Sequence, residues 1–362
     1  MINEIPKEVI SAFTGHKTDF PLAFTGKITI VPIGEGLINR SYKVSCKGEV
    51  PFMLQQINKN VFPNPAEVQE NYVHISRYAA HKFSRLRLPK ILFYDKKKSL
   101  FIDKDKNYWR AFEFIGDSFS LNIAETSAQA RATAKTFAKF TAAFVDFNLD
   151  LLKIVIPDFH NLSLRYQQLE EALAGSRLER MPKALPLVEE LKQREHYKNF
   201  YETVISSGKL PKRAMHHDAK ISNILFSKST QKIICPVDFD TVMPGYFFSD
   251  MGDMIRSMAC NLDESSIEFD KMRIRKGYYR DILEGYLSVM KKYLTGAEIK
   301  YIHYAGLLMI YMQALRFMTD YLNGDSYYRI SYAGQNFDKA KNQLTLLKRL
   351  EEFLQKEYRF KG

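Results

Sequence analysis

Hydrophobic and polar residues follow two different patterns along the chain, and the change falls near residue 115. Before that point, short apolar or alternating runs lie between glycine, asparagine and charged residues, which is typical of strands. Two helices are also expected there: a short amphipathic one near residues 5–13, and one over PAEVQENYVHISRYAAH, which has proline at its first turn. The predicted strands are GKITIVPI, RSYKVSC, VPFMLQQI, KILFYD, LFI and YWRAFEFI.

After Gly116, apolar residues recur at helical spacing. A stripe of phenylalanines in AETSAQARATAKTFAKFTAAFVDFN indicates a helix face turned to the core. A single hairpin, ILFSKSTQKIICPVDF, interrupts the helical pattern. The sequence therefore predicts an α+β fold with a small strand-rich half and a larger helical half. The further predicted helices cover about 162–174, 185–206, 250–260, 270–292, 297–322 and 335–357.

Composition agrees with a soluble folded protein. The 362 residues fit one large or two modest domains, and 46% of them are hydrophobic and 26% charged. The first twenty residues lack the pattern of a signal peptide, and YAGLLMIYMQAL is too short to span a membrane. Three cysteines lie far apart with no CxxC pair, so neither disulfides nor a zinc site are indicated. We expect a cytoplasmic protein.

The net charge of +12 favours an anionic partner. Lysine and arginine are scattered over helical stretches, without a nucleic-acid-binding motif beside them. The charge is therefore expected to serve solubility or the attraction of a multiply charged small substrate, and we expect neither nucleic acid nor membrane as partner. The last helix, KNQLTLLKRLEEFLQ, could dimerise but has too few heptads for a coiled coil, so a monomer and a homodimer both stay open.

Two segments rich in polar residues flank the predicted hairpin: AMHHDAKISN at 214–223 and PVDFDTVMPG at 236–245. A hairpin brings its two flanks to one end. Attack of a hydroxyl on a nucleotide phosphate needs a carboxylate base, oxygen ligands for Mg²⁺ and a cation for the transferring group. Asp218 suits the base, Lys220 the cation, and Asn223 and Asp238 the metal ligands; Asp240 suits a second ligand or an acid supporting the ligands.

These segments resemble those of the protein-kinase-like phosphotransferases. HHDAKISN has the form H-x-D-x-K-x-x-N, and VDFD occupies the place of D-F-G. Within that superfamily the chain looks most like the aminoglycoside phosphotransferase and choline kinase branch, and is most similar to the N-acetylhexosamine 1-kinases. The matching segments, in order, are GEGLINRSY, LQQINKNVF, WR, FH, DAKISN, DFDTVMPG and RFMTDYL.

The resemblance implies a two-lobed kinase-like fold, with a β-rich N-lobe over 1–115 and a helical C-lobe over 116–362. In GEGLINRSY, Gly34 and Gly36 would let backbone N–H groups reach the phosphates, and Asn39 and Ser41 would replace a missing third glycine. The backbone from Glu113 to Ile115 would meet the adenine.

One position departs from the kinase pattern. Kinases carry a lysine on the strand after the glycine loop, which pairs with the phosphates and with a helix glutamate. Gln55 stands in its place, so Glu67 or Glu70 on the next helix lacks that cation. Either the chain is a non-catalytic nucleotide-binding protein, or it belongs to a branch that works without the lysine. The second interpretation is favoured because the other catalytic residues are all present.

Two further residues have alternative roles. Asp250 either accepts backbone N–H groups of the catalytic loop, as in the kinase fold, or caps the helix MGDMIRS. His216 is expected to orient the loop.

For the acceptor, the resemblance points to His160, Arg165, Arg316 and Asp320, together with Lys220. Arginine and histidine suit a sugar with hydroxyls and an N-acetyl carbonyl. The expected activity is transfer of the γ-phosphate of ATP, with Mg²⁺, to the anomeric hydroxyl of an N-acetylhexosamine. Homoserine, choline or an aminoglycoside as acceptor, and GTP as donor, stay open.

Overall fold

The computed structural model describes residues 5–14, 26–33, 38–83, 86–175, 179–360 and 362. By its internal contacts the chain forms two compact units. Unit 1 comprises Met1–Phe119, Asn148–Pro157 and Phe226–Met243, and unit 2 comprises Ser120–Phe147, Asp158–Leu225 and Pro244–Gly362. The predicted fold class is confirmed: the N-terminal region is a β-sheet with two helices and the C-terminal region is helical. The predicted domain boundary after residue 115 stays a prediction.

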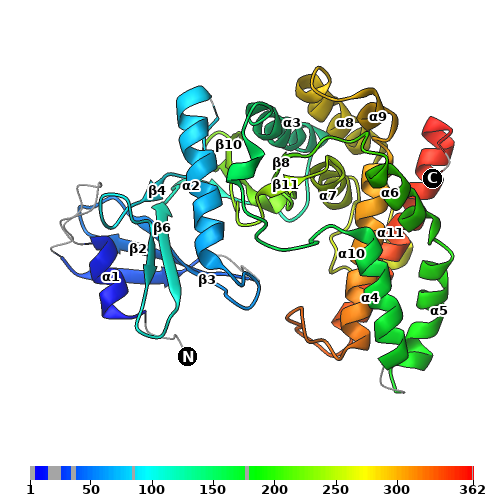
Figure 1. Cartoon of the computed structure of the whole chain (residues 1–362), viewed down its shortest axis with the longest axis horizontal. Coiled ribbons are helices and arrows are strands. Elements are labelled where there is room, and N and C mark those ends of the chain that lie inside the picture. Colours follow the sequence, from blue (N-terminus) through cyan, green and yellow to red (C-terminus); the bar gives the residue numbers. More distant parts are fainter. Residues whose placement is uncertain (1–4, 15–25, 34–37, 84–85, 176–178, 361) are drawn as a thin grey trace. The chain divides into compact units, whose positions relative to one another are not determined.

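Unit 1 is built on an antiparallel sheet with the strand order β1-β2-β3-β6-β4, and β5 pairs with β6 as well (Figure 1). The predicted strands are all present, although KILFYD contributes only two residues to its strand. In the register, Gln55 of β3 lies opposite Arg110 of β6 and Ser41 of β2. The strands are β1 (Ile28–Pro32), β2 (Arg40–Cys46), β3 (Phe52–Ile57), β4 (Ile91–Leu92), β5 (Leu100–Ile102) and β6 (Tyr108–Glu113).

The core of unit 1 lies between this sheet and helix α1 (Lys7–Thr14). Alternate residues of β2 and β3 are buried, as a sheet with one apolar face requires. The buried cluster consists of Val9, Phe13, Tyr42, Val44, Phe52, Leu54, Leu92, Trp109 and Ala111.

Helix α2 (Pro65–Lys82) contacts the segment around Asp238 and Asp240, which is called the acidic segment of unit 1 below. Tyr72 stacks on Phe239 with ring centroids 5.2 Å apart. Asn71 is buried, and its amide donates to the carbonyl oxygens of Val242 and Lys153, both at 2.9 Å. The segment around Asp238 and Asp240 is thereby tied to the same helix that follows β3.

The predicted hairpin is confirmed as β9 (Ile224–Ser227) and β10 (Ile233–Pro236). A further short strand, β7 (Ser118–Phe119), adds to β9, so that the hairpin is part of a three-stranded sheet among the described residues.

Unit 2 is built from helices around α10, which is buried on nearly all sides and packs against α4, α7 and α11 (Figure 1). Close approach of α8 to α3 depends on Gly285, because a Cβ there would lie 2.4 Å from the carbonyl oxygen of Arg131. The helices are α3 (Ser127–Ala143), α4 (Leu162–Gly175), α5 (Met181–Lys192), α6 (His196–Ser206), α7 (Phe248–Met258), α8 (Lys276–Met290), α9 (Gly296–Lys300), α10 (Tyr304–Leu322) and α11 (Gln335–Tyr358).

Two predicted helices are each divided in the structure. The stretch 185–206 forms α5 and α6, separated by a turn at Arg194, whose guanidinium pairs with Glu351 of α11. The stretch 297–322 forms α9 and α10, and α9 begins at a capping box in which Thr295 and Glu298 bond each other's backbone. The predicted helix at 270–292 begins only at Lys276. Within the described part of the chain, none of the helices has the length and apolar character needed to cross a membrane.

Candidate functional site

The loop from His216 to Asn223 in unit 2 is held by a buried aspartate. Strand β8 (Arg213–Met215) leads into the loop, and Asp250 of α7 accepts the backbone N–H groups of His216 and His217 at 3.0 and 2.8 Å. The N-cap of α7 is Phe247, so the loop-holding role predicted as one alternative for Asp250 is confirmed, and the capping role is wrong. Burial raises the pKa of Asp250 to about 7.

The backbone of this loop is strained at His217, whose φ is 64°. Left-handed backbone is uncommon for residues other than glycine and concentrates at functional sites. Gly245 packs directly on the ring, since a Cβ there would lie 2.3 Å from Cε1 of His217. The close packing and the bonds from Asp250 together explain how the loop keeps this conformation.

Asp218 is fixed by its two predicted neighbours in the loop. Lys220 Nζ lies 2.9 Å from its carboxylate, and the Asn223 amide donates to the same carboxylate and to the Asp218 carbonyl, both at 2.8 Å. Burial raises the pKa of Asp218, but Lys220, His216 and Asn223 lower it by more, so the net shift is downward. With 26% of its side chain exposed, Asp218 is an accessible, ionised carboxylate at neutral pH.

Asn223 fits the predicted role of a metal ligand. Both hydrogen bonds to Asp218 use its amide nitrogen. The amide oxygen accepts no hydrogen bond from a residue that the structure describes, and it is oriented by those bonds. An oriented amide oxygen beside a carboxylate is the kind of donor that Mg²⁺ accepts.

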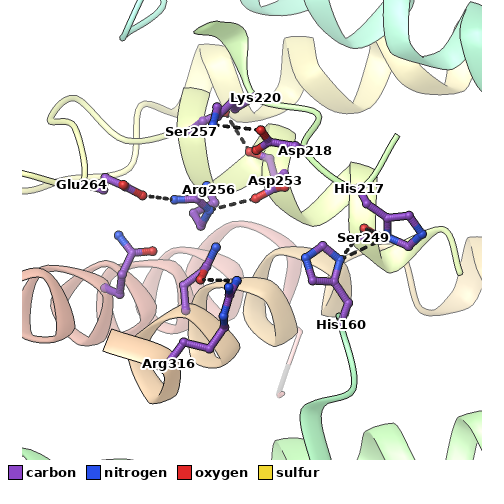
Figure 2. Close-up of polar contacts among 12 residues, drawn as sticks. His160, His217, Asp218, Lys220, Ser249, Asp253, Arg256, Ser257, Glu264 and Arg316 are labelled. Atoms are coloured by element: carbon purple, nitrogen blue, oxygen red, sulfur yellow. Dashed lines mark hydrogen bonds and ion pairs between the residues drawn. The ribbon is translucent and has the colours of Figure 1, made fainter. Parts of the chain in front are cut away.

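A network of charged residues lies beside the loop in unit 2, and Figure 2 shows Asp253, Arg256 and Glu264 of this network. Arg256 pairs with Asp253 at 3.0 Å and with Glu264 at 2.6 Å, and Lys339 lies 3.7 Å from Glu264. Burial raises the pKa of Asp253 to about 6, although Arg256 opposes the shift. Sequence reasoning missed this network, for which the only signal was the acidic pair in SDMGDMIRS.

The two histidines His160 and His217 share Ser249 (Figure 2). Their Nδ1 atoms lie 2.6 and 2.8 Å from the Ser249 hydroxyl. The hydroxyl has one proton, so it donates to one ring and accepts from the other. Burial and the nearby cations hold the pKa of His160 well below its usual range, so His160 is neutral at pH 7. Ser249 was not predicted, and nothing in the sequence singles it out.

Arg165 and Arg316, two residues predicted for the acceptor group, lie near enough to His160 to lower its pKa. Their contact with an acceptor stays a prediction. The Arg316 guanidinium lies over the ring of Phe159 at 5.3 Å and bonds Gln313. Arg165 donates to the carbonyl oxygen of Phe159 at 3.0 Å. Burial and Arg316 lower the pKa of Arg165. Neither arginine forms an ion pair with a carboxylate of the described residues. The cluster of His160, Arg165 and Arg316, called the acceptor cluster below, is therefore cationic.

Asp320, another residue predicted for the acceptor, is also in unit 2, but its carboxylate already accepts several hydrogen bonds from the protein. It accepts the backbone N–H groups of Ser326, Tyr327 and Tyr328 at 2.8–2.9 Å and the Asn336 amide at 2.8 Å. The side chain is buried. Asp320 thus positions the two tyrosines whose rings lie 5.8 and 5.5 Å from the Arg316 guanidinium.

The other predicted residues belong to unit 1. Asp238 follows β10 and has a φ of 65°, which places this metal-ligand candidate on strained backbone like that of His217. Asp240 is nearly buried; one carboxylate oxygen pairs with Arg110 and the other accepts the Asn39 amide at 2.6 Å. No cluster of three or more His, Cys, Asp or Glu side chains able to hold a metal occurs in the described residues.

The nucleotide-binding candidates of unit 1 are partly described. Gly34 and Gly36 lie outside the described residues. Gln55 donates to the Ser41 hydroxyl at 2.9 Å and accepts from Arg110. The side chain of Glu113 accepts the backbone N–H of Lys90, and the carbonyl oxygen of Ile115 accepts the Ser118 hydroxyl. Their contacts to a nucleotide stay predictions.

Comparison with known proteins gives the family. The model of the phosphotransferase enzyme family (APH) matches residues 29–286, more than half of the chain. Among solved structures, an aminoglycoside phosphotransferase from Alicyclobacillus acidocaldarius subsp. acidocaldarius DSM 446 has a TM-score of 0.63 at 13% identity, over 98% of each chain. A choline kinase from Cryptosporidium parvum Iowa II has a TM-score of 0.54 at 15% identity, over 91% of each chain.

A third solved structure is an amicoumacin kinase in complex with AMP-PNP, Ca²⁺ and Ami. Its TM-score is 0.57 at 11% identity, with 90% of this chain and 91% of that chain covered. At these identities the likeness concerns the fold, which is the predicted kinase-like one. The chain therefore belongs to the phosphotransferase enzyme family and has the fold of the aminoglycoside and choline kinases.

Proposed function

We propose that the protein is a small-molecule kinase that transfers the γ-phosphoryl group of ATP to the anomeric hydroxyl of an N-acetylhexosamine. The observation that carries the proposal is the arrangement in unit 2, where an ionised, accessible Asp218 follows a histidine loop that contacts the cationic acceptor cluster. His217 of the loop lies 3.3 Å from His160 of the cluster, measured between their Nδ1 atoms.

Asp218 is the base of the reaction. It orients the acceptor hydroxyl and takes its proton as the bond between the acceptor oxygen and the γ-phosphorus forms and the bond to ADP breaks. Lys220, which lies 2.9 Å from Asp218, stabilises the charge on the transferring group. The products are a sugar phosphate and ADP.

Asn223 and Asp238 would hold the metal ion, which when bound neutralises charge on the nucleotide phosphates. The free amide oxygen of Asn223 supports its assignment. Asp240 is assigned to the support of Arg110, because both its carboxylate oxygens are engaged within unit 1. The amicoumacin kinase, whose structure holds AMP-PNP and Ca²⁺, supports the proposal that this protein uses ATP and a divalent ion.

The charges of the acceptor cluster favour a sugar. Guanidinium groups donate hydrogen bonds to hydroxyl and carbonyl oxygens, which an N-acetylhexosamine offers. The cluster holds Arg165 and Arg316 with a neutral His160, and the Asp320 carboxylate is already used by backbone N–H groups. A cationic aminoglycoside or choline would be repelled by the arginines and would find no available acid among these residues.

The test is incubation with ATP and Mg²⁺ against a panel of N-acetylhexosamines, simple hexoses, homoserine, choline and aminoglycosides, with detection of the phosphorylated product. We expect phosphorylation of an N-acetylhexosamine at its anomeric carbon, and none by an Asp218→Asn variant. Product from choline or aminoglycosides alone would overturn the acceptor assignment. Nucleotide binding without product from any compound would favour a non-catalytic binding protein.

A further inference from the structure

The strand position that carries the phosphate-binding lysine in kinases is neutral here. Gln55 occupies it on β3, and in the sheet register it lies opposite Arg110 on β6. The Gln55 amide oxygen accepts from Nε and Nη2 of Arg110 at 2.9 and 2.6 Å. A cation therefore lies beside the vacant lysine position, supplied by the neighbouring strand.

The helix after β3 no longer offers an acidic partner for such a cation. Glu70 is half exposed and lies 3.7 Å from His74 on the same helix, and Glu67 forms no ion pair with a described residue. Arg110 instead pairs with Asp240 of the acidic segment, and the two side chains are only 3% and 5% exposed. The ion pair that kinases form between strand and helix has been replaced by one between strand and acidic segment.

The guanidinium retains free donors in this arrangement. Arg110 has five N–H groups, and its bonds to Gln55 and Asp240 use only Nε and Nη2. Nη1 donates to none of the residues that the structure describes. A buried charge without its partner is costly, so the ion pair with Asp240 stabilises and orients the Arg110 guanidinium, while none of these bonds uses the two N–H groups of Nη1.

The network also reaches the end of the glycine segment. Asn39 donates to Asp240 at 2.6 Å and accepts the backbone N–H of Asn58 at 2.9 Å, and Ser41 accepts from Gln55. Two residues predicted to contact phosphates are thus joined to Arg110 through side-chain hydrogen bonds within unit 1. Charged donors held in this way suit phosphate oxygens, with which they form charge-assisted hydrogen bonds.

We propose that Arg110, held by Asp240, binds the phosphates of the nucleotide in place of the missing lysine. The assignment rests on the proposed function, because it requires a nucleoside triphosphate as substrate. It makes Asp240 a positioning residue, whose charge acts through Arg110.

The test separates phosphate binding from folding. Arg110→Gln alone would leave Asp240 buried and unpaired, so the informative variant is Arg110→Gln with Asp240→Asn, which removes both charges. Calorimetric titration with AMP-PNP and Mg²⁺, and separately with adenosine, measures binding with and without phosphates. We expect the double variant to bind AMP-PNP roughly 10- to 100-fold more weakly and adenosine as the unmodified protein does.

Two variants sharpen the result. Arg110→Lys keeps the charge and should lose no more than about 10-fold in AMP-PNP affinity. Arg77→Gln, an exposed position on α2 in the same unit, should change neither affinity. Melting temperatures of all variants show that each is folded.

Different results would overturn the role of Arg110 and the proposed kinase function. AMP-PNP affinity unchanged in a folded double variant would overturn the role of Arg110 alone. An equal loss for adenosine and AMP-PNP would also overturn it, since the pair would then support the whole site. Absence of AMP-PNP binding by the unmodified protein would overturn the proposed function, and the assignment with it.

Discussion

The segments 214–223 and 236–245 each contribute an aspartate to one ion pair, and the two pairs differ in their exposure to solvent. In unit 1, Arg110 and Asp240 are 3% and 5% exposed. In unit 2, Lys220 and Asp218 are 36% and 26% exposed. A pair removed from water is costly to break and suits the positioning of a group, whereas an exposed pair contributes little stability and can meet a substrate. In the buried pair the acid therefore fixes the position of a guanidinium, whereas in the exposed pair the acid itself is accessible to a substrate.

Removal of the acid of the exposed pair should have the largest effect, on activity. Asp218→Asn keeps the shape of the side chain but removes the base, so we expect kcat to fall about 1,000-fold or more, from loss of base catalysis and of substrate orientation. Because the side chain is partly exposed, the free energy of unfolding should change by less than about 1 kcal/mol. Steady-state kinetics and denaturant unfolding measure the two quantities. Near-normal kcat would contradict the assignment of the base.

Removal of the acid of the buried pair should act on stability. Asp240→Asn leaves the Arg110 charge buried without a counter-charge, and we expect a loss of about 3 kcal/mol in the free energy of unfolding. Adding Arg110→Gln should restore most of that loss, because the unpaired charge is then gone. Urea unfolding of the three proteins provides the measurement. If both variants were equally destabilised, the pair would not be the cause.

The conformation of the loop that carries Asp218 and Lys220 should depend on Gly245. In Gly245→Ala, the new methyl would collide with the His217 ring, 2.3 Å from Cε1, so the ring and the strained loop before Asp218 must move. A displacement of about 1 Å in a catalytic group costs roughly 100-fold in rate, which is the expected loss in kcat. Gly277→Ala serves as the control, because a Cβ there meets nothing within 4 Å. Unchanged kcat for Gly245→Ala would show that the contact does not position the loop.

The smallest predicted effect concerns pH. The pKa of His160 is lowered by burial, so the unfolded chain binds a proton below about pH 6.5 that the folded chain does not. Stability from this group is therefore complete above pH 6.5 and is lost as pH falls, by at most about 1.4 kcal/mol per pH unit. His160→Asn should flatten the fall in melting temperature between pH 7 and 5.5. An unchanged slope would assign that pH dependence to other groups.

Local patterns determined most of the elements. Helix α2 and the strands of unit 1 were predicted because periodicity and turn residues act over a few neighbouring positions. Asp218, Lys220 and Asn223 were grouped for the same reason, since they lie within six residues of one another and the loop brings them into contact. The breaks between α5 and α6 and between α9 and α10 were missed, because the apolar pattern continues across both turns.

The sequence by itself determined the fold class, the two acidic segments and the residues with the right chemistry in them. Only the tertiary structure decided which groups they meet. Arg110 and Asp240 are 130 residues apart and become partners through the sheet and the anchoring of the acidic segment by α2. The choice between two roles for Asp250 likewise depends on contacts between distant elements, because its carboxylate on α7 accepts the backbone N–H groups of His216 and His217. Sequence patterns report local backbone preference and burial, whereas the partner of a buried polar group is set by long-range packing.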